Sequence, residues 1–107
     1  MEISVGLCGP GRHEMPVQEF IFPPIVDNPL DFQTNSDKAK EWLFELDDVV
    51  GTVNVYVTGL TPVLTAFLNA WYSGRFDNIA HNGPVMPDVR LYHFNRDTGS
   101  YDSQELY

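Results

Sequence analysis

Residues 52–74, TVNVYVTGLTPVLTAFLNAWYSG, predict a strand, a tight turn and a helix in succession. In residues 52–58, β-branched and other residues alternate, which is typical of a half-buried strand. Gly59-Leu60 supplies the turn, because glycine lets the backbone reverse closely. This unit places a strand and a helix next to each other, and the rest of the fold is predicted around it.

The helix of this unit is predicted from its ends and its apolar face. Thr61 can cap the helix, and Pro62 suits the first helical position, where no amide donor is missed. Gly74 is placed where a left-handed helix stop belongs. The apolar face consists of Val63, Leu64, Phe67, Leu68 and Trp71. Such a broad face indicates a helix packed on a core, with Trp71 buried on its inner side.

The flanking sequence predicts further strands and one more helix. Ser36 can cap a helix that stops near Asp47-Asp48, where acidic side chains are unfavourable. Gly83-Pro84 indicates a loop over residues 75–88. Asp97-Thr98-Gly99 is typical of a hairpin turn. Strands are predicted over residues 3–7, 17–22, 89–94 and 101–106.

The resulting order predicts an α/β fold. We expect residues 1–107 to form a single domain, with a small mixed sheet, a Rossmann-like strand–helix–strand crossover and two main helices. The first two strands and the last two are expected to add antiparallel edges. A chain of 107 residues with 43% hydrophobic residues has enough apolar surface for one core.

The charge of the chain limits its partners. Six Lys and Arg residues against 15 Asp and Glu residues give a net charge of −9. This balance argues against direct binding to duplex nucleic acid and to anionic membranes, because both attract clustered basic residues. An acidic, soluble surface is the most common interpretation of such a charge, and a basic partner is compatible with it.

The cysteine count and the lengths of the apolar segments predict the cellular compartment. Cys8 is the only cysteine, so an intrachain disulfide and a thiolate-rich metal site are both excluded. The N-terminus shows no signal peptide, and no apolar run has the roughly 20 residues that a spanning helix needs. A cytoplasmic protein without a cofactor is therefore expected. The sequence is also compatible with a homodimer.

Three polar segments are candidates for a ligand site. The turn with Thr58, Gly59 and Thr61 precedes a helix, whose free amides can bind an anion. Arg12 and His13 follow the first strand, and their guanidinium and imidazole groups suit anion binding and proton transfer. The structural alternatives are a helix cap in the first segment and an exposed polar turn in the second.

The third segment contains His93 and Arg96, at the end of the last long strand. If that strand is parallel to the strands over residues 3–7 and 52–58, the three segments are expected to meet at one edge of the sheet. The structural alternative is a sheet-face histidine next to an arginine paired in the turn. Their convergence would be the strongest sign of a site.

Two stretches carry a resemblance. The run from Val53 to Leu64, the run from Tyr92 to Tyr101 and the Gly-Arg-His-Glu stretch at residues 11–14 resemble small α/β proteins of bacterial prophages and mobile elements. This resemblance implies no established activity. The strand–turn–helix element also resembles, more distantly, CRISPR-associated Rossmann-fold domains that bind cyclic oligonucleotides.

The sequence thus predicts a non-enzymatic accessory protein of a phage or mobile element. It is expected to bind a host protein, and antagonism of host defence is one such role. The alternative is a nucleotide-binding or phosphodiester-cleaving protein, in which the Thr58–Thr61 turn holds phosphate. In that hypothesis Arg12 and Arg96 neutralise charge, and His13 or His93 transfers the proton.

Overall fold

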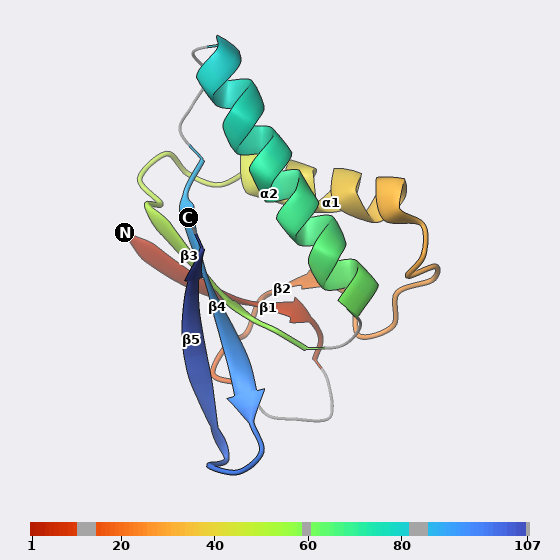
Figure 1. Cartoon of the computed structure of the whole chain (residues 1–107), viewed down its shortest axis with the longest axis vertical. Helices are drawn as coiled ribbons and strands as arrows, with labels where there is room; N and C mark the ends of the chain where they lie inside the picture. Colours follow the sequence, from red (N-terminus) through yellow and green to blue (C-terminus); the bar gives the residue numbers. More distant parts are fainter. Residues whose placement is uncertain (11–14, 59–60, 82–85, 107) are drawn as a thin grey trace.

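The computed structural model describes residues 1–10, 15–58, 61–81 and 86–106, with the backbone alone for residues 77–81. These residues form a mixed five-stranded sheet and two helices, which confirms the predicted α/β class (Figure 1). The elements are β1 (Glu2–Cys8), β2 (Phe20–Phe22), α1 (Phe32–Phe44), β3 (Thr52–Tyr56), α2 (Thr61–His81), β4 (Asp88–Asn95) and β5 (Ser100–Leu106). No helix among the described residues is long and apolar enough to cross a membrane.

The strands lie in the order β2-β1-β3-β4-β5. The first four are parallel, and only β5 is antiparallel to its neighbour β4. The expectation of an antiparallel first pair was wrong, because Phe20 lies opposite Gly6 in a parallel register. The predicted return of the last strand as an antiparallel edge is confirmed.

Both helices cover the same face of the sheet and pack against each other (Figure 1). The strand order explains this arrangement. The steps from β2 to β3 and from β3 to β4 lead in the same direction across the sheet, and right-handed crossovers then place both helices on one face. In its described residues, the connection between β1 and β2 contains no helix. The opposite face therefore has no helical cover, and we call it the helix-free face.

The hydrophobic core lies between the sheet and the two helices. Alternate strand residues point into it, and Val5, Val55 and Leu91 lie side by side in the register of β1, β3 and β4. Each of these three side chains is at most 3% exposed. From the helices, the core receives Ala39, Leu43, Val63, Phe67, Ala70 and Trp71.

Helix α1 begins earlier than predicted. Its N-cap is Asp31, whose carboxylate accepts a hydrogen bond from the Thr34 amide at 3.2 Å. The prediction of Ser36 as the cap was wrong, because Ser36 lies one turn inside the helix and is buried against α2. There its hydroxyl oxygen lies 3.3 Å from Asn69 Nδ2 and accepts a hydrogen bond.

Helix α2 runs past its predicted stop at Gly74 and ends at His81. The glycine serves packing instead, because a Cβ at Gly74 would lie 2.7 Å from Met86 Cε. The predicted loop over residues 75–88 is correspondingly shorter. Trp71 is confirmed as a core residue, with 0% exposure, and its indole Nε1 donates to the Pro87 carbonyl at 2.8 Å.

Candidate functional site on the helix-free face

Aromatic side chains line the helix-free face at the middle of the sheet. Tyr56 of β3 lies opposite Tyr92 of β4 in the parallel register. Their rings stack with centroids 4.7 Å apart and planes inclined by 13°. Because the neighbouring residues Val55 and Leu91 point into the core, the two tyrosines point to the other side of the sheet.

Two further rings extend this stack toward β5. Phe94 and Tyr101 are cross-strand partners, and their centroids lie 5.4 Å apart. Tyr101 also meets Tyr56 edge-on at 4.9 Å. Phe94 is 40% exposed, and the three tyrosines are half-buried. We call these four residues the aromatic cluster.

Two tyrosine hydroxyls of the cluster, those of Tyr56 and Tyr101, have raised pKa values. Burial raises the pKa of Tyr56, and the neighbouring Tyr92 and Tyr101 add to this effect. Burial also raises the pKa of Tyr101. Among the described residues, no hydrogen-bond partner reaches the buried Tyr101 hydroxyl. The Tyr56 and Tyr101 hydroxyls are thus neutral at pH 7, and the cluster presents mainly apolar ring surface.

A polar row crosses the same face next to the aromatic cluster, with Arg90 at its centre. The guanidinium lies 3.3 Å from the Glu2 carboxylate and 3.3 Å from the Glu105 carboxylate, and it also donates to Asn54 Oδ1 at 3.2 Å. A hydrogen bond with Tyr92 and these carboxylates raise the pKa of Arg90. Arg90 therefore ties β1, β3 and β5 to β4.

Phe20 closes the β2 end of the helix-free face. Its ring lies over Gly6 and Gly9, where an added Cβ would approach ring carbons to 2.4 Å and 2.5 Å respectively. Met15 lies over Gly6 as well, because its Cε would be 3.3 Å from the same Cβ. This end of the face is therefore covered by the chain itself, whereas the aromatic cluster lies toward β5.

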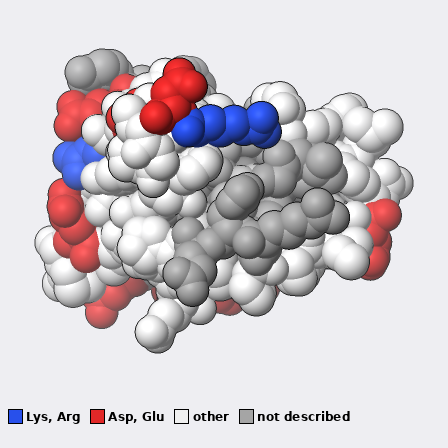
Figure 2. All heavy atoms as spheres, turned by 90° about the horizontal axis from the view of Figure 1, so that it is seen from below, with Lys and Arg blue, Asp and Glu red and all other residues white. Residues whose placement is uncertain are grey.

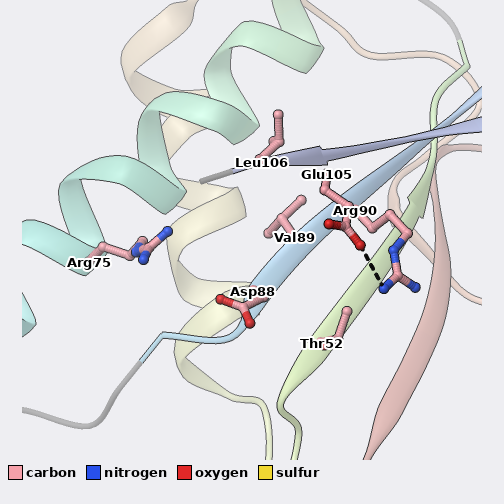
Figure 3. Close-up of a pocket in the computed structure, with 7 residues that line it drawn as sticks. All are labelled: Thr52, Arg75, Asp88, Val89, Arg90, Glu105 and Leu106. Carbon is pink, nitrogen blue, oxygen red and sulfur yellow. Dashed lines mark hydrogen bonds and ion pairs between the residues drawn. The ribbon is translucent and has the colours of Figure 1, made fainter.

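A pocket of about 250 Å³ lies where β3 and β4 begin and β5 ends (Figure 3). Its lining residues are Thr52, Arg75, Asp88, Val89, Arg90, Glu105 and Leu106. Its basic and acidic side chains are balanced, and Arg90 is already paired with Glu105. The Arg75 guanidinium lies 4.9 Å from the Trp71 ring centroid. This charge balance gives the pocket no preference for an anion or a cation.

The structure describes four of the sequence-predicted site residues, two around the start of α2 and two on the β4–β5 hairpin. Arg12, His13 and Gly59 lie outside the described residues. Thr58 is half-buried, and its hydroxyl donates to the Cys8 carbonyl at 2.7 Å. Thr61 is exposed and is the first residue of α2. Because Thr58 has a single hydroxyl proton, this bond leaves it able only to accept from a ligand.

His93 and Arg96 lie on the β4–β5 hairpin. The His93 ring Nε2 lies 2.8 Å from Gln104 Oε1, so this nitrogen carries the proton. Although β4 is parallel to β1 and β3, it continues past Tyr92 to Asn95, which is about 10 Å at ~3.3 Å per residue. Arg96 is exposed in the turn that follows, where the hairpin extends away from the start of α2 (Figure 1). No contact among the described residues joins Arg96 to Thr58.

Cys8 does not act as a nucleophile at neutral pH. The side chain is 6% exposed, and burial raises the pKa of its thiol to about 11. The thiolate, which is the reactive form, is therefore scarce at pH 7. Cys8 packs as a small apolar residue at the end of β1.

The aromatic cluster was not among the sequence-predicted site residues. The signal was nonetheless present, because Tyr56 follows the core residue Val55 and Tyr92 follows the core residue Leu91 along two strands. Large aromatic residues at solvent-facing strand positions are typical of a binding surface. Tyr101 was placed on an edge strand, but its contact with Tyr56 depends on the sheet order.

On one face of the molecule, the charged side chains lie mainly around uncharged residues. Figure 2 shows Asp and Glu atoms mainly toward the outline, with basic side chains beside some of them.

Comparison with protein-family models, with curated proteins and with solved structures finds no match for this chain. The helix-free face, with its aromatic cluster and polar row, is the candidate functional site of the described residues.

Proposed function

We propose that this protein is a non-enzymatic binding protein that holds a partner protein on its helix-free face. The observation that carries this proposal is the aromatic cluster of Tyr56, Tyr92, Phe94 and Tyr101 on the face without helices. Tyrosine and phenylalanine are enriched at the centres of protein interfaces, where their large rings are buried at a low cost in conformational entropy.

The polar row supports a protein partner over a nucleic acid. Aromatic rings on a sheet can also stack bases, but such surfaces combine the rings with basic side chains that follow the phosphates. Here Arg90 is held by Glu2 and Glu105, and the chain as a whole has a net charge of −9. Phosphates near these carboxylates would be repelled.

The resemblance to prophage and mobile-element proteins suggests which partner to seek. Under the proposal, the partner is a protein of the host cell, and components of host defence are the first candidates. The alternative function, nucleotide binding or phosphodiester cleavage through the Thr58–Thr61 turn, is tested separately below.

The experiment compares matched surface variants as baits in host lysate. Phe94→Ser and Tyr92→Ser alter the aromatic cluster, whereas Phe76→Ser alters a 75% exposed residue of α2. Circular dichroism first checks that each variant folds. We expect a partner that the parent and Phe76→Ser retain, and that the two cluster variants lose. Equal recovery of every captured protein by all four baits would overturn the proposal.

A further inference from the structure

Strand β5 has an open edge beside the aromatic cluster. It is the last strand of the sheet, and among the described residues it pairs only with β4. All of its residues, from Ser100 to Leu106, are in register with β4 without a bulge. A regular, unpaired edge of this length can accept a further strand.

The backbone groups that point outward follow from the hydrogen bonds of β4. The Val57 amide donates to the Tyr92 carbonyl at 2.9 Å, so the polar groups of Tyr92 face β3. The backbone amides and carbonyls of the alternate β4 residues, His93 among them, therefore point toward β5. In the antiparallel register His93 lies opposite Asp102, so the backbone amide and carbonyl of Asp102 point toward β4. The outward-facing amides and carbonyls of β5 are those of Tyr101, Ser103 and Glu105.

The side chains of this edge are acidic and polar. Residues 100–106 contain Asp102 and Glu105 and no Lys or Arg. Both carboxylates are exposed, and they lie on opposite faces of β5 because strand side chains alternate. The Asn95 amide holds one oxygen of Asp102 at 2.9 Å, and Arg90 holds one oxygen of Glu105 at 3.3 Å.

We propose that the edge of β5 takes up an extended, basic segment of the partner protein as a sixth strand. This inference rests on the proposed binding function and specifies the chemistry of the partner. Lysine or arginine residues three positions apart on the added strand would meet Glu105 on one face and Asp102 on the other. Side chains of the added strand that point to the helix-free face would lie next to Tyr101 and so extend the aromatic cluster.

The edge lacks three of the features that usually prevent such pairing. Natural edge strands are often protected by lysine, by proline or by a bulge, and the charged side chains of β5 are carboxylates, which repel an acidic strand and not a basic one. Pairing with a second copy of this chain is disfavoured by charge, because each copy has a net charge of −9. A basic partner is attracted instead, and this attraction weakens as salt screens it over about 8 Å at 0.15 M.

A random library of twelve-residue peptides displayed on a carrier tests the proposal, with the parent and Ser103→Pro as parallel baits. Proline removes the outward amide of Ser103 and no hydrogen bond to β4. Ser103→Thr is the matched control, since it keeps the amide. We expect peptides enriched in Lys and Arg that bind the parent and Ser103→Thr equally. Their binding to Ser103→Pro should be about tenfold weaker or more, from one lost hydrogen bond and a steric clash.

Amide hydrogen exchange of the parent gives a second measurement that does not depend on the variant. The selected peptide should slow exchange at Tyr101, Ser103 and Glu105, which are not protected by β4. Selected peptides without an excess of basic residues would overturn the inference, as would unchanged exchange at these amides or a selection that yields no binder.

The two proposals can fail separately. A host partner that is lost from Tyr92→Ser but retained by Ser103→Pro would leave the binding function in place and refute the strand addition. A partner that is retained by both variants would refute the binding function itself. Loss from both variants, together with slowed exchange in β5, supports the two proposals jointly.

Discussion

Tyr56 stacks on Tyr92 across the two central parallel strands, with ring centroids 4.7 Å apart and planes inclined by 13°. Because the strands are in register at this point, the contact requires no distortion of the sheet. No helix of the described residues lies above this side of the sheet, and both rings are only half-buried (Figure 1). The stack therefore links the stability of the sheet to the proposed binding face.

The stack should be measurable as a coupling energy. A double-mutant cycle with Tyr56→Leu and Tyr92→Leu is expected to give about 0.5–1.5 kcal/mol beyond the sum of the single losses, the range for aromatic pairs. Urea unfolding of the four proteins measures it. Tyr56→Leu combined with Tyr72→Leu is the control, and those effects should simply add because Tyr72 lies on α2, across the sheet from the helix-free face. A coupling near zero for the first pair would contradict the stacked geometry.

Trp71 should be the most costly single core residue to truncate. It is 0% exposed and donates to the Pro87 carbonyl, so Trp71→Ala creates a cavity and leaves that carbonyl without its donor. We expect a loss of about 3–5 kcal/mol in the free energy of unfolding. Phe76→Ser, on the same helix but 75% exposed, should change it by about 0.5 kcal/mol or less. A soluble Trp71→Ala protein that melts close to the parent would disprove the packing.

Gly6 should tolerate no side chain while Phe20 is present. A Cβ at Gly6 would lie 2.4 Å from Phe20 Cδ1, so Gly6→Ala must displace the ring, at a cost of about 1–3 kcal/mol. In a Phe20→Ala background the same change should cost much less, because the obstructing ring is gone. Chemical unfolding of the single and double variants gives the comparison. Equal costs in both backgrounds would show that the ring does not limit this position.

Thr58 should matter for stability even if the turn binds nothing. Its hydroxyl donates to the Cys8 carbonyl at 2.7 Å, so Thr58→Val keeps the volume but leaves a part-buried acceptor without its donor. We expect a loss of about 1–3 kcal/mol. An unchanged melting temperature for Thr58→Val would contradict the hydrogen bond.

The nucleotide alternative is decided by ligand-dependent stabilisation. If the Thr58–Thr61 turn holds phosphate, mono-, di- or cyclic oligonucleotides should raise the melting temperature of the parent, and Arg96→Ala should reduce that rise while leaving the unliganded value unchanged. Arg96 is exposed, so its replacement is a mild change. No shift with any nucleotide at millimolar concentration would remove this alternative.

Stability should fall as the solution becomes alkaline. Burial raises the pKa of Cys8 from 9.0 to about 11, so the folded state keeps the proton that the unfolded state releases. The contribution of Cys8 is therefore complete below about pH 9 and is lost as pH rises toward 11. Unfolding of the parent between pH 8 and 11 measures this, and Cys8→Ala should show a shallower decline. The raised pKa values of Tyr56 and Tyr101 act in the same direction, so part of the decline should persist in Cys8→Ala.

The sequence by itself determined the element types wherever the periodicity was strong. Val53 and Val55 alternate with polar or aromatic residues, and this period of two occurs only in a strand with one buried face. Trp71 was placed in the core for the corresponding reason, since it lies on the apolar stripe of a helix. The acidic charge and the single cysteine likewise follow from composition alone.

Helix ends were less well determined because they depend on neighbours outside the local pattern. Ser36 has the chemistry of a cap, but its packing against Asn69 of α2 made it an interior residue, and Asp31 became the cap. Gly74 has the chemistry of a helix stop, but Met86 packs into the space that a side chain at this position would fill. In both positions a tertiary contact overrode a local preference.

The candidate site was decided by the tertiary structure. Nothing in the sequence states that β1 and β2 are parallel or that both helices cover one face, and these facts leave Tyr56, Tyr92, Phe94 and Tyr101 together on the other face. The sequence supplied the alternation that points each ring outward from its own strand. Only the order and register of the strands, which arise from contacts between residues far apart in the chain, placed the rings in contact.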